Sequence, residues 1–376
     1  MHVRVLLDAT AVPADRGGVG RYVDELVPEL AAAGADLVIA AQHRDADLYA
    51  DAAPSVEVVA APRSLERREV RMAWEQVGLP ALVRRVRADV LHSPHYTMPR
   101  GVSVPVVVTL HDATFFTTPE LHLRTKAAFF RHATRVAVRR AAVLVVPSRA
   151  TRDEVLRLVG GRRDDFHVAY HGVDHGRFRP APTEEQERVR RSLDLGTSSY
   201  VGFLGTLEPR KNVPALVRAW TAVCAGLAEP PALVLAGGRG WDDDLDAAVE
   251  AVPDHLVVRR PGYLPLGDLP GFLAGAEVLA YPSLGEGFGL PVLEAMACGA
   301  SVLTTRELSL PEVGGDAVAY CGTGEASIAE ALASLLADAD ERARLRAAAV
   351  TRAAQFTWAD AARRHLEAYE TALRRR

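Results

Sequence analysis

The chain of 376 residues carries a formal net charge of −4, is 49% hydrophobic and has a mean hydropathy of +0.03. This length allows two domains with full cores, and no apolar stretch approaches the roughly 20 residues that a membrane-spanning helix needs. The opening residues, MHVRVLLDAT, include an arginine and have a strand pattern. We therefore expect a cytoplasmic protein without a signal peptide.

Cysteine usage favours the same compartment. Cys224, Cys298 and Cys321 are far apart in the sequence, and each lies in an apolar segment. We therefore expect buried, reduced thiols. No cluster of Cys and His has the spacing of metal ligands, so no metal site is predicted.

Short apolar runs, typical of strands buried on both faces, alternate with helical patterns along the whole chain. In the first half they cover residues 3–7, 37–40, 56–59, 90–92, 106–110, 143–146 and 167–170. In the second half they cover residues 200–204, 232–236, 256–258, 278–281, 301–303 and 318–320. Such alternation predicts parallel sheets covered by helices, and this many strands exceeds one comfortable sheet.

Between the two groups of strands lies GRFRPAPT, residues 176–183, which is rich in proline and arginine. We predict an α/β protein with two Rossmann-like domains, residues 1–175 and 180–357, whose parallel sheets face each other across a cleft. Ligands of such sheets bind at the carboxyl ends of the strands. Other nucleotide folds fit poorly, because the dinucleotide fingerprint begun by Gly18 fails at Val23 and no phosphate-loop motif occurs.

A glycine-rich loop follows the first strand. Gly17, Gly18 and Gly20 open a helix in DATAVPADRGGVGRYVDEL, residues 8–26. Peptide N–H groups at such a helix start can bind an anion, and glycine lets a ligand approach the backbone closely. A flexible loop with a helix cap fits the same residues equally well. The residues alone leave both interpretations open.

Polar side chains follow two other strands of the first half. His111 and Asp112 end the strand in VVVTLHDATFF, and His95 and Tyr96 lie in the loop HSPHYTMP. A histidine at the carboxyl end of a buried strand can donate to a sugar oxygen or a phosphate, or it can be a structural residue with an internal partner. His95, Tyr96 and Asp112 are candidates to line an acceptor site.

The segment LHLRTKAAFFRHATRVAVRRA, residues 121–141, contains no acidic residue. Four arginines recur at helical spacing and form one stripe, flanked by two phenylalanines: Arg124, Arg131, Arg135 and Arg139, with Phe129 and Phe130. The stripe is typical of a solvated helix whose arginines pair elsewhere, or of a helix that contacts anionic lipid headgroups or a pyrophosphate-linked lipid. Nucleic-acid binding is disfavoured because no aromatic stacking platform accompanies the charge.

Two adjacent cations, Arg210 and Lys211, follow the first strand of the second half in FLGTLEPRKN, residues 203–212. Lysine is scarce in this chain, and Lys126 is the only other one. The carboxyl end of a parallel strand faces the ligand, so two cations there suit a diphosphate. Surface charges at a helix start are the alternative, but cations at that end oppose the helix dipole.

The segment PSLGEGFGLPVLEAMACG, residues 282–299, joins a glycine-rich turn to a helix and contains two carboxylates, Glu286 and Glu294. The turn and the helix dipole favour a phosphate, whereas each carboxylate requires another partner, such as a pair of hydroxyls. A nucleotide sugar has hydroxyls on both sides of a diphosphate. Solvated glutamates at a helix start are the alternative, but a pair of them around three glycines favours the ligand.

The spacing of Glu286 and Glu294, with seven residues between them, resembles the E-x7-E signature of glycosyltransferase family 4. The segment GEGFGLP is similar to the common form of that signature. Members of this family are retaining enzymes with the GT-B fold. The resemblance implies catalytic roles for His111, Arg210, Lys211 and Glu286. It also implies donor contacts for a larger set: Gly17, Gly18, Gly205, Gly262, Tyr263, Leu264, Gly287, Phe288, Gly289, Leu290 and Glu294. One departure is His171, where the family commonly has the asparagine of N-G-V-D.

The resemblance further implies transfer of a hexose from a nucleoside diphosphate without a cofactor or catalytic metal. GGVGRY, LHDATFF and LEPRKN are similar to mannosyltransferases of surface polysaccharide synthesis. We therefore expect GDP-mannose as the donor, a glycan or lipid-linked acceptor, and peripheral contact with the inner membrane face through residues 121–141. The last helix, residues 358–376, is expected to pack back onto the first domain. A UDP- or dTDP-sugar enzyme, a silent nucleotide-sugar-binding scaffold, an epimerase and a phosphorylase remain alternatives.

Overall fold

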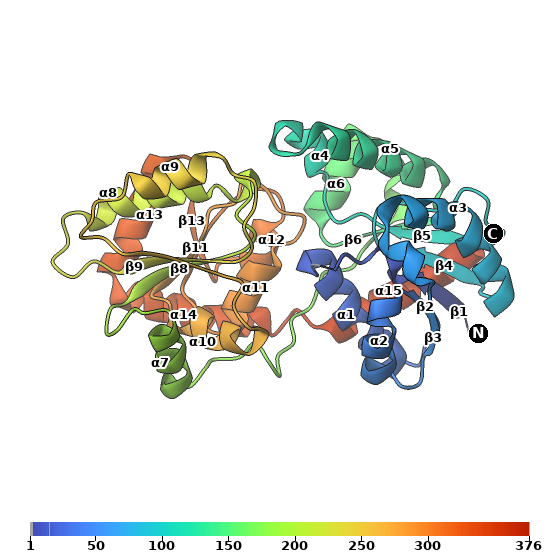
Figure 1. Cartoon of the computed structure of the whole chain (residues 1–376), viewed down its shortest axis with the longest axis horizontal. Coiled ribbons are helices and arrows are strands. Elements are labelled where there is room, and N and C mark those ends of the chain that lie inside the picture. Colours follow the sequence, from blue (N-terminus) through green and yellow to red (C-terminus); the bar gives the residue numbers. More distant parts are fainter. Residues whose placement is uncertain (1–2, 15, 376) are drawn as a thin grey trace. The chain divides into compact units, whose positions relative to one another are not determined.

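The computed structural model describes residues 3–14 and 16–375. The chain divides into two compact units (Figure 1). Unit 1 consists of Met1–Gly172 together with Thr357–Arg376, and unit 2 of Val173–Phe356. Unit 1 is therefore built from two segments that lie at opposite ends of the sequence.

Unit 1 contains a seven-stranded parallel sheet in the order β3-β2-β1-β4-β5-β6-β7. Its strands are β1 (Arg4–Asp8), β2 (Asp36–Ala41), β3 (Glu57–Ala60), β4 (Val90–Ser93), β5 (Val106–Thr109), β6 (Val143–Val146) and β7 (Phe166–Val168). The strand order reverses between β1 and β4, and this switch point is where ligands of open α/β sheets bind. Because helices cover both faces, nearly every residue of the central strands β1, β4 and β5 is buried.

Unit 2 contains a six-stranded sheet in the order β10-β9-β8-β11-β12-β13, and every strand pairing in it is parallel. Its strands are β8 (Tyr200–Leu204), β9 (Ala232–Ala236), β10 (Val258–Gly262), β11 (Val278–Tyr281), β12 (Val302–Thr305) and β13 (Ala319–Cys321). The switch point lies between β8 and β11. The prediction of an α/β protein with two parallel sheets is confirmed.

One strand lies later than the sequence indicated. Residues 256–258 were expected as a strand, but β10 begins at Val258 and continues through Pro261 to Gly262. Leu256 instead closes a turn, because its N–H donates to the Pro253 carbonyl at 2.9 Å. A proline is tolerated in β10 because this strand lies at the edge of the sheet, where one row of N–H groups has no partner.

Helices connect the strands in both units (Figure 1). Unit 1 has α1 (Gly17–Ala32), α2 (Ala46–Ala52), α3 (Arg68–Val86), α4 (Thr114–Thr117), α5 (Arg124–Arg140), α6 (Arg149–Leu158) and α15 (Trp358–Arg374). Unit 2 has α7 (Thr183–Ser192), α8 (Val213–Cys224), α9 (Asp244–Glu250), α10 (Leu269–Gly275), α11 (Leu290–Ala297), α12 (Leu310–Gly314), α13 (Glu325–Ala337) and α14 (Ala339–Ala353). In the described part of the chain, no helix has the length and apolar character needed to cross a membrane.

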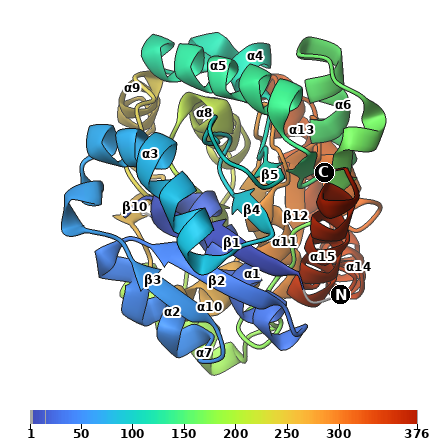
Figure 2. The same cartoon turned by 90° about the vertical axis from the view of Figure 1, so that its right-hand side faces the viewer.

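The last helix, α15, packs against α1 and against strands β4 to β7 of unit 1 (Figure 2). Buried hydrogen bonds join it to them. The Tyr22 hydroxyl contacts His365 Nε2 at 2.7 Å and the Thr109 hydroxyl at 3.0 Å. The Tyr369 hydroxyl contacts His92 Nδ1 at 2.9 Å. Since these groups are buried, each needs its partner to offset the loss of water.

The three cysteines are free thiols, and all three are buried, as the sequence predicted. They lie in unit 2, in or directly beside α8, α11 and β13. Burial raises the pKa of the Cys224 and Cys321 thiols to about 11. They therefore remain protonated at neutral pH and behave as small apolar residues.

Candidate active site

The loop that follows β11 leads into α11 through Gly289, which has φ +102° and therefore adopts a conformation that favours glycine. Pro291 occupies the first turn of α11, where its missing N–H costs nothing. The Ser309 hydroxyl donates to the carbonyls of Glu286 at 2.8 Å and Phe288 at 2.9 Å. Ser309 lies just before α12, so this neighbouring segment fixes the shape of the loop.

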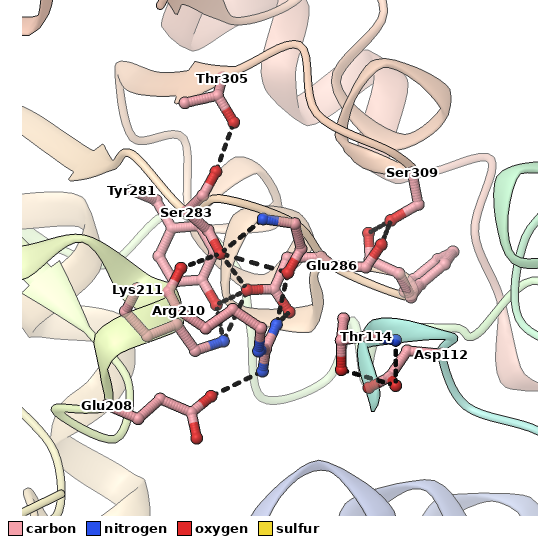
Figure 3. Close-up of polar contacts among 12 residues, drawn as sticks. Asp112, Thr114, Glu208, Arg210, Lys211, Tyr281, Ser283, Glu286, Thr305 and Ser309 are labelled. Atoms are coloured by element: carbon pink, nitrogen blue, oxygen red, sulfur yellow. Dashed lines mark hydrogen bonds and ion pairs between the residues drawn. The ribbon is translucent and has the colours of Figure 1, made fainter. Parts of the chain in front are cut away.

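Glu286 lies at the centre of a buried polar cluster at the carboxyl ends of β8 and β11 (Figure 3). Its Oε1 accepts hydrogen bonds from Lys211 Nζ at 2.6 Å, from the Ser283 hydroxyl at 2.7 Å and from the Tyr281 hydroxyl at 3.0 Å. Its Oε2 pairs with Arg210 Nη1 at 2.7 Å. The carboxylate and both cations therefore belong to one site, which joins two sequence motifs 75 residues apart.

Arg210 has several acceptors around its guanidinium. Nη1 also donates to the Gly285 carbonyl at 2.5 Å, and Nη2 donates to Glu208 Oε1 at 2.7 Å. Lys211 Nζ donates in addition to the Tyr281 hydroxyl at 2.6 Å. Planar, multidentate bonding of this kind holds a guanidinium in one orientation. The two cations point toward the loop before α11 and are rigidly placed.

The charges of this cluster influence one another strongly. Burial acts to raise the pKa of Glu286, but the Arg210 and Lys211 charges outweigh it and hold that pKa well below its usual range. Burial lowers the pKa of Lys211, and the neighbouring Arg210 lowers it further, while Glu286 opposes the shift. Perturbed groups gathered at the end of a parallel sheet are characteristic of functional sites.

The surface-charge interpretation of Arg210 and Lys211 does not hold. Both lie in a 3₁₀ turn, Pro209–Lys211, rather than at the start of α8, and Lys211 is only 7% exposed. The turn is supported by interlocking loops after β8 and β9. A Cβ on Gly237 would fall 2.1 Å from the Gly205 carbonyl oxygen, so only glycine allows these two loops to touch.

The other donor-side candidates of unit 2 differ in their exposure. Phe288 and Leu290 are buried, and Glu294 lies in the second turn of α11 with 2% of its surface exposed. Gly262 ends β10, accepts a hydrogen bond from Gly237 N–H and lines a pocket with Leu207, Leu235, Gly237, Arg239, Asp246 and Arg260. Tyr263 is 64% exposed beside it, and Leu264 is half-buried.

In unit 1, Gly17 and Gly18 begin α1 and are exposed. His111 lies just beyond β5, and its Nε2 contacts the Pro94 carbonyl at 2.7 Å. Because a carbonyl only accepts, Nε2 carries the hydrogen. Burial lowers the pKa of His111, so the imidazole is neutral at pH 7 and Nδ1 is an acceptor. This geometry suits a bond from a sugar hydroxyl better than a bond to a phosphate.

The remaining unit 1 candidates are tied to the protein itself. Asp112 Oδ1 accepts from the Thr114 N–H at 3.1 Å and from its hydroxyl at 2.9 Å, which fixes the start of α4 (Figure 3). The Tyr96 hydroxyl accepts from the Asp112 N–H at 2.9 Å, and its ring is buried against Phe115 and Phe130. Tyr96 therefore lies behind Asp112, in the core. The His95 and His111 rings lie 5.8 Å apart.

Comparison with known proteins identifies the chain. Residues 16–177 match the model described as Glycosyltransferase Family 4, and residues 185–352 match that of Glycosyl transferases group 1. The O-antigen chain mannosyltransferase B of Escherichia coli is 31% identical over 94% of this chain and 96% of its own length. The chain belongs to glycosyltransferase family 4. It is a retaining glycosyltransferase, and the resemblance seen in its motifs is confirmed.

More distant relatives of this glycosyltransferase have other activities. The D-inositol 3-phosphate glycosyltransferase of Corynebacterium kroppenstedtii is 27% identical over 96% of the chain and 86% of its own length. Among solved structures, Anabaena HepE in complex with UDP and glucose covers 97% of the chain and 99% of its own, with a TM-score of 0.75 and 19% identity. WaaG, a glycosyltransferase involved in lipopolysaccharide biosynthesis, covers 96% of the chain and 98% of its own length, with a TM-score of 0.74 and 15% identity. These structures support the GT-B fold.

Sequence reasoning missed several residues of the glycosyltransferase cluster. Tyr281 and Ser283 flank the glycine loop, and Glu208 lies two residues before Arg210. Their polar side chains beside recognised motifs were a usable signal. Ser309 lies 23 residues from the glutamate whose carbonyl it contacts. Nothing in the sequence around Ser309 indicated that contact, because it depends on how α12 packs beside the loop.

Proposed function

We propose that this glycosyltransferase moves mannose from GDP-mannose to a glycan or lipid-linked acceptor in cell-surface polysaccharide synthesis. The observation that carries the proposal is the shared Arg210, Lys211 and Glu286 cluster, which combines two cations for a diphosphate with a carboxylate for hydroxyls. The choice of mannose rests on the 31% identity to the O-antigen mannosyltransferase along nearly the whole chain. A nucleoside diphosphate is also the ligand named for HepE, a structural neighbour.

The cluster suggests how the donor binds. Glu286 already receives four partners, which is about the full acceptor capacity of a carboxylate. When a diphosphate enters, Arg210 and Lys211 turn part of their hydrogen bonding toward it, and Glu286 becomes available to the hydroxyls of the sugar. The same cations then stabilise the charge that develops on the leaving diphosphate. The leaving phosphate assists the acceptor hydroxyl.

Other residues complete the proposed donor site. The N–H groups from Gly287 to Leu290 precede the positive end of α11 and suit a phosphate oxygen, while Glu294 holds the ribose hydroxyls. Gly205, Gly262, Tyr263 and Leu264 line the nucleotide. In unit 1, taken by itself, Gly17 and Gly18 open a helix start that suits a phosphate, and His111 has an acceptor nitrogen that suits a sugar hydroxyl. Asp112 and His95 lie on the acceptor side, with Tyr96 supporting Asp112.

A panel of sugar nucleotides tests the proposal. Thermal unfolding is followed with GDP-mannose, UDP-glucose and dTDP-glucose, and hydrolysis of each donor is measured alongside. We expect GDP-mannose to give the largest rise in Tm and to be the donor consumed, because a ligand that binds the folded state stabilises it. A response to UDP-glucose alone favours the UDP-sugar alternative. Binding without turnover by any donor favours a silent scaffold.

We further propose that α5 brings this enzyme to anionic membranes. Four of its arginines are exposed, and among the described residues none of the four forms an ion pair with an acidic side chain: Arg124, Arg135, Arg139 and Arg140. Leu123, just before the helix, is 65% exposed. Basic residues beside an exposed apolar side chain suit the headgroup layer of a membrane. The enzyme would then act at the inner face of the plasma membrane.

One predicted member of the arginine stripe serves the fold instead. Arg131 Nε donates to the Phe115 carbonyl at 2.6 Å, and its guanidinium lies over the Phe116 ring. Phe130 is buried and stacks on Phe115 at 4.6 Å between ring centroids. Phe129, the other phenylalanine predicted to flank the stripe, is half-buried. The proposed membrane surface therefore consists of Leu123 and the four exposed arginines.

A further inference from the structure

Glu208 contacts Arg210, one of the two cations of the cluster, although no motif assigns Glu208 a role. Its Oε1 accepts a hydrogen bond from Arg210 Nη2 at 2.7 Å, while Arg210 Nη1 pairs with Glu286. One guanidinium therefore lies between two carboxylates. The Glu208 and Arg210 side chains are 13% and 14% exposed, so this ion pair is largely shielded from water.

The backbone holds Glu208 in this position. It caps the 3₁₀ turn that contains Arg210 and Lys211. The preceding Leu207 N–H donates to the Gly238 carbonyl at 3.0 Å. A Cβ on Gly240 would fall 1.9 Å from the Leu207 carbonyl oxygen, so the loop after β9 packs tightly against this segment. The position of the carboxylate follows from the fold and is not a chance surface contact.

The two carboxylates are bound unequally. Glu286 has three partners besides Arg210, namely Lys211, Tyr281 and Ser283. In the described part of the chain, Arg210 is the only side chain that pairs with Glu208. With two cations and two carboxylates, the cluster carries no net charge. An anion that binds Arg210 therefore lies near the Glu208 carboxylate, which pairs with no other side chain of the described residues.

We propose that Glu208 is a positioning residue that orients Arg210 and sets how tightly the enzyme holds a nucleoside diphosphate. It neutralises Arg210 before the ligand binds, and its charge then opposes that of the bound diphosphate, so the product leaves more readily. This inference rests on the proposed function, in which Arg210 and Lys211 bind the diphosphate. Coulomb repulsion at a largely buried position is weakly screened, so its effect on affinity is measurable.

Calorimetric titration with GDP and with UDP tests the inference on the full-length enzyme. Glu208→Gln keeps an acceptor for Arg210 and removes the charge, and we expect roughly three- to tenfold tighter binding of the diphosphate that wild type prefers. Glu208→Asp retains the charge and is expected to bind as wild type does. The matched control is Glu325→Gln, which removes one carboxylate from the exposed Arg218–Glu325 pair and leaves affinity unchanged.

Steady-state kinetics provide a second readout. For Glu208→Gln we expect lower KM for the donor and stronger inhibition by the diphosphate product. If Glu208→Gln does not fold, Glu208→Ala removes the same charge and is expected to shift affinity in the same direction. If a folded variant without the Glu208 charge binds the diphosphate as wild type does or more weakly, the inference about Glu208 is overturned, while the proposed function still stands. If wild type binds neither diphosphate, the proposed function fails, and the inference fails with it.

Discussion

At the residue scale, the proposed active site is a small group of polar side chains that share one buried space. Lys211 is one of two lysines in the chain, and it is bound by Glu286 and Tyr281 at 2.6 Å each. A buried lysine bears the cost of desolvation only where an opposite charge compensates it. The cluster thus holds two cations where, in the proposed mechanism, the leaving group gains charge.

Replacing Lys211 by alanine tests this role. We expect kcat to fall roughly 100-fold or more, because losing one preorganised donor to a developing oxyanion costs about that much. The measurement is single-turnover transfer from the preferred donor, with circular dichroism to verify folding. Lys126→Ala, which changes the other lysine, is expected to retain full turnover on a soluble acceptor. Turnover of Lys211→Ala within threefold of wild type would contradict the assigned role.

At the element scale, α5 combines a packing face with a charged face. Ala127, Phe130 and Ala137 are buried on one side, while the exposed arginines occupy the other. The helix thus covers the core, while its four exposed arginines form no ion pair with an acidic side chain of the described residues. The helix α15 differs, because its exposed arginines pair with acids on the same helix, as Arg363 does with Asp360 and Glu367.

Sedimentation with vesicles tests the membrane surface of α5. We expect wild type to bind phosphatidylglycerol vesicles at low salt, to release them at high salt and to ignore phosphatidylcholine vesicles. Each arginine near an anionic surface is worth about 1 kcal/mol, so replacing Arg124, Arg135 and Arg139 by glutamine lowers the partition coefficient roughly 100-fold. The matched control replaces Arg363, Arg364 and Arg374 by glutamine. An equal loss of vesicle binding in both triple variants would show that α5 is not a specific membrane surface.

At the scale of the whole molecule, each unit has its own sheet and core, but unit 1 needs the end of the chain to complete it. The helix α15 supplies His365 and Tyr369 to the buried hydroxyls and imidazoles of α1, β4 and β5. Burial lowers the pKa of His365 from 6.5 to about 4, although its bond to the Ala361 carbonyl opposes the shift. Burial also lowers the pKa of His92.

These histidines make stability depend on pH. In the unfolded chain His365 takes up a proton near pH 6.5, whereas in the folded protein it does so only near pH 4. The contribution of His365 to the free energy of unfolding is therefore complete above about pH 6.5 and is lost as the pH falls toward 4. We expect wild type to lose on the order of 2 kcal/mol from this group between about pH 7 and pH 5. Urea unfolding at both pH values measures it.

His365→Phe removes the titrating group and is expected to flatten this pH dependence by the same amount, whatever its effect on absolute stability. The control is His43→Phe, at an exposed histidine, which is expected to leave the pH dependence as in wild type. An unchanged slope in His365→Phe would show that α15 is not the source of the acid sensitivity.

The sequence by itself determined the two sheets and their strands, apart from the displaced edge strand β10, and it determined the family and the motifs of the site. Apolar runs and glycine turns are local signals, because burial on both faces demands an apolar strand and a tight turn demands glycine. Tertiary structure alone decided that Glu286 is bound by both cations, that Arg131 and Tyr96 serve the core, and that Ser309 fixes the loop. Those facts depend on which segments meet in space, and a local pattern of residues does not contain that information.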